Sequence, residues 1–255
     1  MALIKKNLFK ILGLKNYLRL LHKGFHFSYA QNFLKKDNIY RYHYFDKKFI
    51  REGDTVLDIG ANLGYYTLLF AKWVGQSGKV YAVEPVKDFA ETIKWASKRF
   101  NNIELYNYAL GEKEQDVILA TPDNFGYLRT GLAHVIEGDE KNEKHEFSFK
   151  AQMKKGSVLF ANIPKLDFIK CDIEGYEEIV LPEMNLVIMK FKPPIQLETW
   201  GDHQPKVETY LLDCGYEKYS LDEDKLKPLA EIKKPIPGDF IFIHKDNQEI
   251  LRRLS

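Results

Sequence analysis

The chain has 255 residues, of which 45% are hydrophobic and 29% are charged, as in ordinary soluble globular proteins. Its longest stretch without an acidic or basic side chain, Ile59–Ala71, has 13 residues and is too short to span a bilayer. The two cysteines, Cys171 and Cys214, exclude a disulfide framework and argue against a cysteine zinc site.

The net charge of +2 conceals a strong asymmetry along the chain. Residues 1–36 contain eight Lys or Arg and no acidic residue, whereas the remaining 219 residues contain 30 basic and 36 acidic ones. Lys10, Lys15 and Arg19 interrupt any apolar core of a signal peptide, so we expect a cytoplasmic protein, with peripheral membrane contact as an option. Such a basic arm is typical of contact with nucleic acid or an anionic membrane surface.

The first segment is predicted to be an amphipathic helix, because its apolar residues recur at spacings of three and four. These residues are Ile4, Leu8, Ile11, Leu14, Leu18 and Leu21, with a weak point at Gly13. Further helices are expected at Tyr29–Lys36 and Tyr40–Ile50. We therefore predict an N-terminal helical cap over residues 1–52. Its residues Ile4, Leu8, Ile11 and Leu18 would pack on the main domain, on a partner subunit in a homo-oligomer, or on an anionic membrane.

From Thr55 onward, short strands alternate with helices, which indicates a mostly parallel sheet with helices on both faces. The expected strands are Thr55–Ile59, Lys79–Glu84, Ile103–Ala109, Leu166–Cys171, Ile195–Thr199, Glu217–Leu221 and Asp239–His244. The expected helices are Tyr65–Trp73, Asp88–Phe100, Tyr176–Glu183 and Lys206–Cys214. No helical pattern separates the last two strands, so we expect an antiparallel edge hairpin there. Residues 53–255 would form one domain.

The segment Gln115–Lys150 breaks this alternation, and residues 120–157 are predicted to be a variable insertion on the substrate side. Strand-like segments are expected at Asp116–Ala120 and Glu146–Lys150, with a glycine-rich loop at Phe125–Gly131 between them. Because ligands of such sheets bind at the carboxyl ends of the strands, the functional residues are expected directly after each strand.

The first strand runs into Asp58-Ile59-Gly60-Ala61-Asn62-Leu63-Gly64. The glycines permit a tight turn and a close approach of the backbone to a ligand. Their spacing fits neither the dinucleotide fingerprint nor a P-loop. Asp58 stands within an apolar strand and needs a partner, which would be either an amine of the ligand or a backbone N–H of the turn.

The second strand ends in Glu84-Pro85, where an acidic residue can accept hydrogen bonds from both hydroxyls of a ribose. Pro85 turns the chain away from the sheet. After the fourth strand, Lys170, Asp172 and Glu174 alternate with apolar residues and are expected on one side of the strand. They would hold a cofactor amine, orient a substrate hydroxyl or bind a metal, and Lys170 alternatively forms a structural salt bridge.

Four segments together carry a family resemblance: Val56–Thr67, Val83–Pro85, Asn107–Gly111 and Asp167–Glu177. Over about residues 53–216 the chain resembles the FkbM family of S-adenosylmethionine-dependent methyltransferases. The resemblance implies the Rossmann-like α/β fold of class I methyltransferases, with a seven-stranded, mostly parallel sheet whose last strand is antiparallel. It also implies methyl transfer to a hydroxyl of a sugar, glycan or secondary metabolite, with S-adenosylhomocysteine as product.

The resemblance also assigns roles to residues of this chain. The glycine turn would surround the methionine half of the cofactor, Glu84 would bind the ribose, and Ala109 and Leu110 would lie near the adenine. The residues expected to bind the cofactor are Asp58, Gly60, Ala61, Asn62, Gly64, Tyr65, Glu84, Pro85, Ala109, Leu110 and Asp172. Asp172 and Glu174 would also lie beside the point of methyl transfer.

Methyl transfer to an alcohol benefits from a base, because the attacking oxygen loses its proton. Glu198 and His203 follow the fifth strand and are candidates for this base. The catalytic candidates are therefore Asp172, Glu174, Glu198 and His203. The sequence requires no metal, although Asp172, Glu174 and Glu198 leave a Mg²⁺ site open.

Two other functions remain as alternatives to a methyltransferase that acts on a small molecule or glycan. The first is a nucleic-acid methyltransferase that uses the basic arm. It is disfavoured by the acidic body of the chain and by the lack of an Asp/Asn-Pro-Pro-Tyr/Phe motif after the fourth strand, so we expect no nucleic-acid partner. The second is a non-catalytic protein that kept the fold and binds a membrane surface or a partner.

Overall fold

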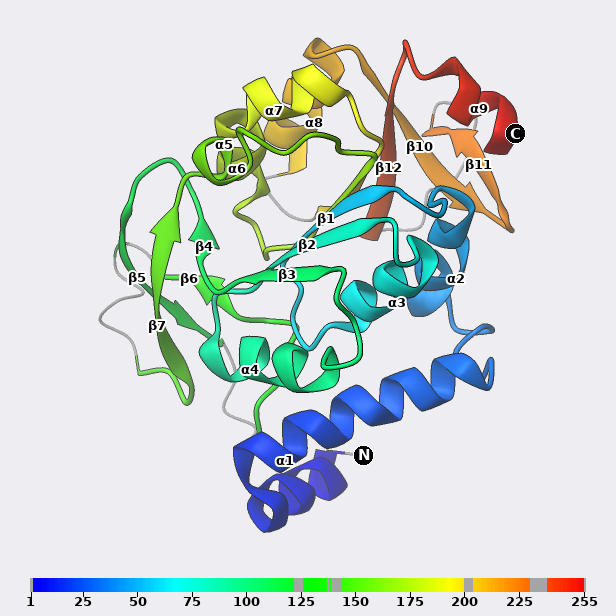
Figure 1. The fold of residues 1–255 in the computed structure, drawn as a ribbon. Coiled ribbons are helices and arrows are strands. Elements are labelled where there is room, and N and C mark those ends of the chain that lie inside the picture. The colour runs from blue at the N-terminus through cyan, green and yellow to red at the C-terminus, as the bar shows by residue number, and fades with distance from the viewer. Residues whose placement is uncertain are drawn as a thin grey trace.

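The computed structural model describes residues 2–121, 126–136, 138, 144–199, 204–229 and 238–254. Its centre is an eight-stranded sheet with the order β11-β10-β12-β9-β8-β1-β2-β3 (Figure 1). The strands are β1 Thr55–Ile59, β2 Lys79–Val83, β3 Ile103–Tyr106, β8 Phe168–Cys171, β9 Ile195–Thr199, β10 Tyr216–Asp222, β11 Lys225–Pro228 and β12 Gly238–His244. Strands β1, β2, β3, β8 and β9 are parallel, and β12 is antiparallel to both β9 and β10. This confirms the α/β fold and the antiparallel last strand that the sequence predicts.

The far end of the sheet confirms one expectation and corrects another. The last two predicted strands, β10 and β12, do pair antiparallel, with β12 next to β9, but β10 is not the edge and the sheet has eight strands rather than the expected seven. Phe240–Ile243 in β12 are buried on both faces of the sheet, as is typical of a strand in the interior of a sheet rather than at its edge. The edge is instead the added strand β11, which pairs with β10 across the turn at Glu223. The segment Lys225–Pro228 is too polar to be recognised as a strand from its pattern.

Helices cover both faces of this sheet. On one face lie α2 (Arg41–Phe45), α3 (Tyr65–Trp73) and α4 (Lys87–Ala96), and on the other lie α5 (Gly156–Leu159), α6 (Glu177–Glu183), α7 (Asn185–Phe191) and α8 (Gln204–Asp213) (Figure 1). Alternate residues of β1 supply the two cores: Leu57 and Ile59 pack toward α6 and α7, whereas Val56 packs toward α2 and α3. The chain ends in α9 (Gln248–Leu254).

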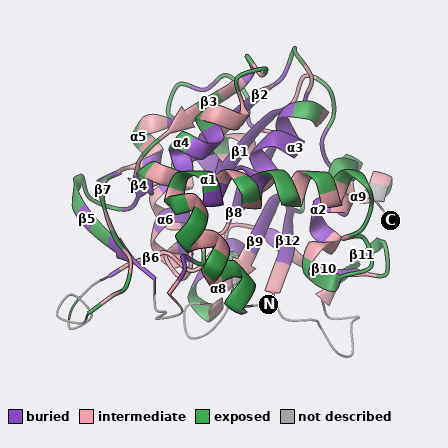
Figure 2. Cartoon of the chain, turned by 90° about the horizontal axis from the view of Figure 1, so that it is seen from below, coloured by how far each residue is buried: buried purple, intermediate pink, exposed green. Residues whose placement is uncertain are grey.

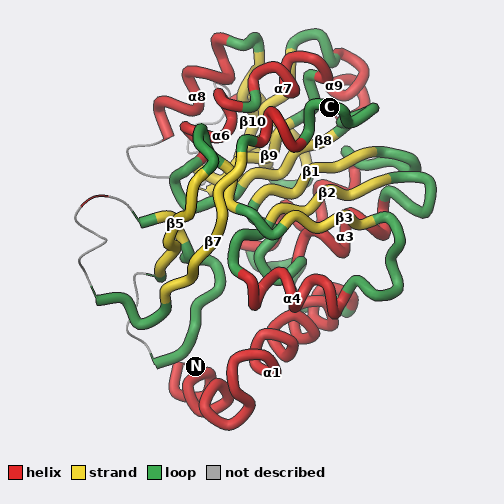
Figure 3. The backbone as a smooth tube through the Cα atoms, turned by 60° about the vertical axis from the view of Figure 1, so that its left-hand side comes forward, coloured by secondary structure: helices red, strands yellow, loops and turns green. Residues whose placement is uncertain are grey.

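The insertion forms a second sheet with the order β4-β7-β5-β6. Its strands are β4 Ala109–Leu110, β5 Gln115–Ala120, β6 His134–Val135 and β7 Ser148–Lys154. Figure 3 shows β5 and β7 standing beside the main sheet. The single strand expected at Ile103–Ala109 is thus divided between the two sheets, because β3 ends at Tyr106 and the chain turns before Ala109.

The N-terminal segment is one long helix with a break. Helix α1 spans Ala2–Ala30, and at Gly13 the backbone leaves helical geometry (φ 67°, ψ 168°), as the predicted weak point requires. It packs on α3 and α4 rather than on the sheet. The expected helix at Tyr29–Lys36 is wrong, because α1 continues to Ala30 and is followed by turns. The helix expected at Tyr40–Ile50 is reduced to α2 between two short 3₁₀ turns at Asn38–Tyr40 and Asp46–Lys48.

The buried face of α1 is also not the expected one. Leu18 is buried and Leu8 is half-buried, but Ile4 and Ile11 are 64% and 79% exposed. The break at Gly13 changes the direction of the chain, so a single helical periodicity does not hold across it. Among the described residues, no helix is both long enough and apolar enough to cross a membrane.

The junction between β1 and β8 offers a test of the fold. Gly60 has φ +83°, and a Cβ atom there would lie 1.8 Å from the carbonyl oxygen of Asp172. We expect Gly60→Ala to lower the free energy of unfolding by about 3 kcal/mol or more, measured by urea denaturation. The control is Gly131→Ala, where the added Cβ meets no atom within 4 Å. Equal stability of the two variants would contradict this packing.

Candidate active site

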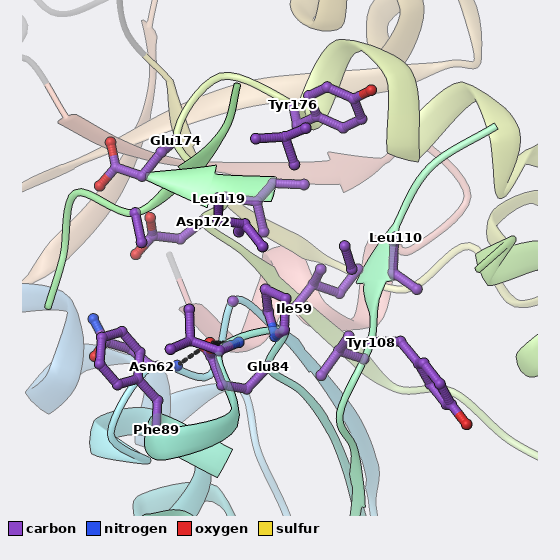
Figure 4. Close-up of a pocket in the computed structure, with 18 of the residues that line it drawn as sticks. Ile59, Asn62, Glu84, Phe89, Tyr108, Leu110, Leu119, Asp172, Glu174 and Tyr176 are labelled. Carbon is purple, nitrogen blue, oxygen red and sulfur yellow. Dashed lines mark hydrogen bonds between the residues drawn. The ribbon is translucent and has the colours of Figure 1, made fainter. Parts of the chain in front are cut away.

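A cleft opens at the carboxyl ends of β1, β2 and β8, between them and the second sheet, and its empty space together with its open mouth is about 670 Å³ (Figure 4). Many of the residues that the sequence singled out line it. These are Gly60, Asn62, Glu84, Pro85, Ala109, Leu110, Asp172 and Glu174. Its position is the one that parallel α/β sheets use for ligands.

The glycine turn forms the base of the cleft. The amides of Gly60 and Ala61 both donate to the carbonyl of Val83, at 3.0 and 2.9 Å, which fixes the turn to the end of β2. Asn62 follows in the left-handed region (φ 52°), and its Nδ2 donates to the carbonyl of Thr130 at 2.9 Å. The turn is therefore held between β2 and the loop of the insertion.

Glu84 is the central acidic group of this cleft. Its Oε2 accepts from the amide of Asn62 at 2.7 Å and its Oε1 from the amide of Val86 at 2.8 Å (Figure 4). The residue is only 4% exposed, and this burial raises the pKa of its carboxyl to about 8, although the two amide donors act in the opposite direction. Glu84 thus joins β2 to the glycine turn and keeps acceptor capacity toward the cleft.

Asp58 lies behind the cleft rather than in its wall. It is fully buried, and its Oδ2 accepts a hydrogen bond from the Thr67 hydroxyl at 2.5 Å. This partner is neither the ligand amine nor the backbone N–H that the sequence suggested. Its Oδ1 has no hydrogen-bond partner among the described residues. Burial raises the pKa of Asp58 to about 6, opposed chiefly by the Lys170 ammonium.

The turn after β8 forms the opposite wall. Strand β8 ends at Cys171, and Glu174 and Gly175 have positive φ angles of 56° and 98°. The alternation expected to carry Glu174 onto the same side as Lys170 and Asp172 is therefore wrong, because the chain leaves extended geometry first. Lys170 and Asp172 do share one side, and they form an ion pair at 2.8 Å.

A buried charge cluster surrounds Lys170, whose side chain is 3% exposed. Burial alone would lower the pKa of Lys170, but Asp172, Asp58 and Asp239 together raise it above its ordinary value. Glu198 at the end of β9 hydrogen-bonds to Asp172, which requires a proton on one of the two carboxyls. The negative charge of Asp172, followed by burial, raises the pKa of Glu198 to about 9. The proton of this hydrogen bond is therefore assigned to Glu198.

The structure does not bring every predicted residue to the cleft. Gly64 faces α1, and its carbonyl accepts a hydrogen bond from His26 Nε2 at 3.3 Å. The ring of Tyr65 packs 4.5 Å from that of Phe25 on α1. His203 lies outside the described residues. Within the described ranges, no three His, Cys, Asp or Glu side chains are grouped closely enough to hold a metal, so Asp172, Glu174 and Glu198 form no Mg²⁺ site there.

Several residues of the site were missed by sequence reasoning. Glu177 is 3% exposed and accepts from the amides of Ile173 and Gly175, at 2.8 and 3.0 Å, so it shapes the turn that carries Asp172. Its place in the Asp-x-Glu-Gly-Tyr-Glu run was the signal available. The apolar walls come from separate elements, and no local pattern marks them: Phe89, Tyr108, Leu119, Ala133, Val135, Ile173 and Tyr176.

These groups fit the chemistry of S-adenosylmethionine. Glu84 presents carboxyl oxygens as acceptors at the base of the cleft, and the walls beside Leu110 are apolar. Asn62 also lines the cleft, and its buried Oδ1 has no hydrogen-bond partner among the described residues. Acceptors beside apolar walls suit a ligand that contains a nucleoside, as S-adenosylmethionine does.

Comparisons with known proteins find methyltransferases. One curated relative is a protein-L-isoaspartate O-methyltransferase of Methanocella arvoryzae, 39% identical over 59 residues, which are 22% of this chain and 31% of that protein. Another, from Archaeoglobus fulgidus, is 38% identical over 58 residues, or 22% of this chain and 26% of the relative. The chain thus spans about a third or less of the length of these relatives.

Among solved structures, an FkbM methyltransferase from Methylobacillus flagellatus superposes with a TM-score of 0.51 at 15% identity. The superposition covers 74% of this chain and 43% of that one, and it supports the fold. The family described as the methyltransferase FkbM domain matches residues 58–218. Because that match includes more than half of the sequence, this chain belongs to the methyltransferase FkbM domain family.

Proposed function

We propose that this protein is an S-adenosylmethionine-dependent O-methyltransferase whose acceptor is a hydroxyl of a small molecule or glycan. The observation that carries the proposal is the burial of the Glu84 carboxyl in the cleft. It lies at the base of the cleft between the glycine turn and β2, where it accepts hydrogen bonds from two backbone amides. A buried carboxylate is costly unless its charge is used, and ribose hydroxyls would use it.

The cofactor supplies an electrophilic methyl group, and the chain supplies position and proton transfer. Asp172 lines the cleft, accepts a hydrogen bond from the protonated Glu198 carboxyl and is held in place by its ion pair with Lys170. An acceptor hydroxyl that donates to Asp172 would become more nucleophilic and pass its proton to this pair. Asp172 is thus proposed as the base. Glu198 is proposed as the neighbouring carboxyl that is hydrogen-bonded to Asp172 and stabilises it during the proton transfer.

The direct test is the thermal stability of the full chain with S-adenosylhomocysteine. At a ligand concentration 100 times the dissociation constant, binding stabilises a protein by about 2.7 kcal/mol, which raises the Tm of a chain of this size by about 5–10 °C. Adenosine monophosphate serves as a control for nucleotides in general. No shift with S-adenosylhomocysteine at millimolar concentration would contradict the proposed function.

A further inference from the structure

The outer side of α1 carries large apolar side chains that remain exposed in the described part of the chain. Figure 2 shows both halves of the helix exposed along the same side of the molecule. Leu3, Ile4 and Ile11 are 71%, 64% and 79% exposed. Leu20 and Phe27 on the second half of α1, and Phe33 just after it, are also exposed. We call these six residues the cap surface: Leu3, Ile4, Ile11, Leu20, Phe27 and Phe33.

The inward side of α1 explains why these residues remain outside. Leu8, Phe9 and Leu12 pack toward the rest of the chain, and the ring of Phe9 lies 5.2 Å from that of Tyr17. Leu18 and Tyr17 are buried against the glycine turn and α4. The helix is therefore already anchored by one apolar side, and the cap surface is a second one that the fold does not use.

Positive charge surrounds the cap surface. Residues 1–36 carry eight cations and no acidic residue. Two of these eight lie over the Trp95 ring, with the Arg19 guanidinium 4.6 Å and the Lys23 ammonium 5.4 Å from its centroid. The groove between α1 and α4 adds Lys94 and Lys98. Asp88 and Glu91 also line this groove. Lys15, Arg19, Lys23, Lys94, Lys98 and Arg99 form no ion pair with any residue in the described ranges.

We propose that the cap surface docks this protein on an anionic membrane, with α1 lying in the plane of the interface. Aliphatic tips such as Leu3, Ile4 and Ile11 are suited to insertion among acyl chains, and lysines beside them are suited to lipid phosphates. Nucleic acid would use the cations but not the exposed leucine and isoleucine. An acidic protein partner would need apolar side chains that match six residues spread over two helix segments.

The test is co-sedimentation of the full chain with vesicles. We expect binding to vesicles of phosphatidylcholine with phosphatidylglycerol, weaker binding at high salt, and little binding to phosphatidylcholine alone. The triple variant Leu3→Ser/Ile4→Ser/Ile11→Ser should bind about tenfold more weakly or worse. The charge variant Lys10→Glu/Lys15→Glu/Lys23→Glu should lose the dependence on anionic lipid.

The matched control replaces exposed apolar residues on the opposite side of the sheet. Val158, Leu186 and Leu212 lie on α5, α7 and α8, away from α1 (Figure 1), and their triple Ser variant should bind vesicles like the native chain. Equal loss in both triple variants, or none in either, would overturn the proposal. So would native dimers that dissociate in the Leu3/Ile4/Ile11 variant, or RNA binding without vesicle binding. The Tm shift with S-adenosylhomocysteine should be unchanged in all variants, which separates this test from that of the proposed function.

Discussion

Glu84→Ala is expected to abolish the stabilisation by S-adenosylhomocysteine, with a dissociation constant raised about 100-fold or more. The carboxylate would accept two hydroxyl hydrogen bonds in a buried site, and each hydrogen bond to a charged group contributes about 1.5–3 kcal/mol. Isothermal titration calorimetry would measure the loss. Glu84→Gln would not restore binding, because its NH₂ group would face the amide of either Asn62 or Val86, which are donors themselves.

The control for this prediction is Glu91→Ala, which removes an exposed carboxylate from α4 and should bind the ligand like the native chain. Native affinity in the Glu84→Ala variant would show that the ribose is bound elsewhere. The variant must also be folded, which its circular dichroism spectrum and a cooperative thermal transition would establish.

The raised pKa of Glu84 leads to two further expected results, one for stability and one for ligand binding. The pKa of Glu84 in the folded protein, about 8, exceeds its ordinary value of 4.5, so the folded state binds more protons between these values. The free energy of unfolding of the native chain, relative to Glu84→Ala, should therefore fall as pH rises from 5 to 8.5.

Ribose hydroxyls favour the ionised carboxylate of Glu84, so ligand binding at pH 7 should release a proton. Calorimetry in buffers of different ionisation enthalpy would detect it.

Lys170→Met is expected to be the most destabilising substitution near the site. It removes the cation that lies among Asp58, Asp172 and Asp239 and leaves three carboxyls in a buried region. Loss of one partner from a buried charge cluster costs about 3–5 kcal/mol, which corresponds to a Tm lower by about 10 °C for a chain of this size. Lys225→Met, on the exposed edge strand β11, should leave the Tm nearly unchanged.

The sign of the pH dependence identifies the cause. Without Lys170, the buried carboxyls take up protons more readily in the folded state, and lowering the pH from 7 to 5 neutralises them. The penalty of Lys170→Met should therefore shrink as the pH falls over this range. A penalty that stays constant with pH would indicate lost packing against the Tyr66 ring, which lies 4.8 Å from the Lys170 ammonium, rather than uncompensated charge.

Local signals determined much of the fold and part of the site. The alternation of apolar strands with amphipathic helices predicts the parallel sheet from β1 to β9, because each of these strands is short, apolar and bounded by turn residues. The residues directly after β1, β2 and β8 were found from sequence for the same reason: parallel strands bring their carboxyl ends to one edge. Gly60, Glu84 and Asp172 therefore needed no tertiary information to be placed in one cleft.

Only the tertiary structure decided the features that depend on contacts between distant segments. Strand order placed β12 between β9 and β10, and the polar strand β11 exists only because β10 offers it a partner. Asp58 lies behind the cleft because the Thr67 hydroxyl and Lys170 surround it there. The apolar spacing of α1 predicts one buried side that includes Ile4, Ile11 and Leu18. The break at Gly13 and the packing on α3 and α4 bury Leu18 but leave Ile4 and Ile11 exposed, because periodicity does not report where a helix bends or what it packs on.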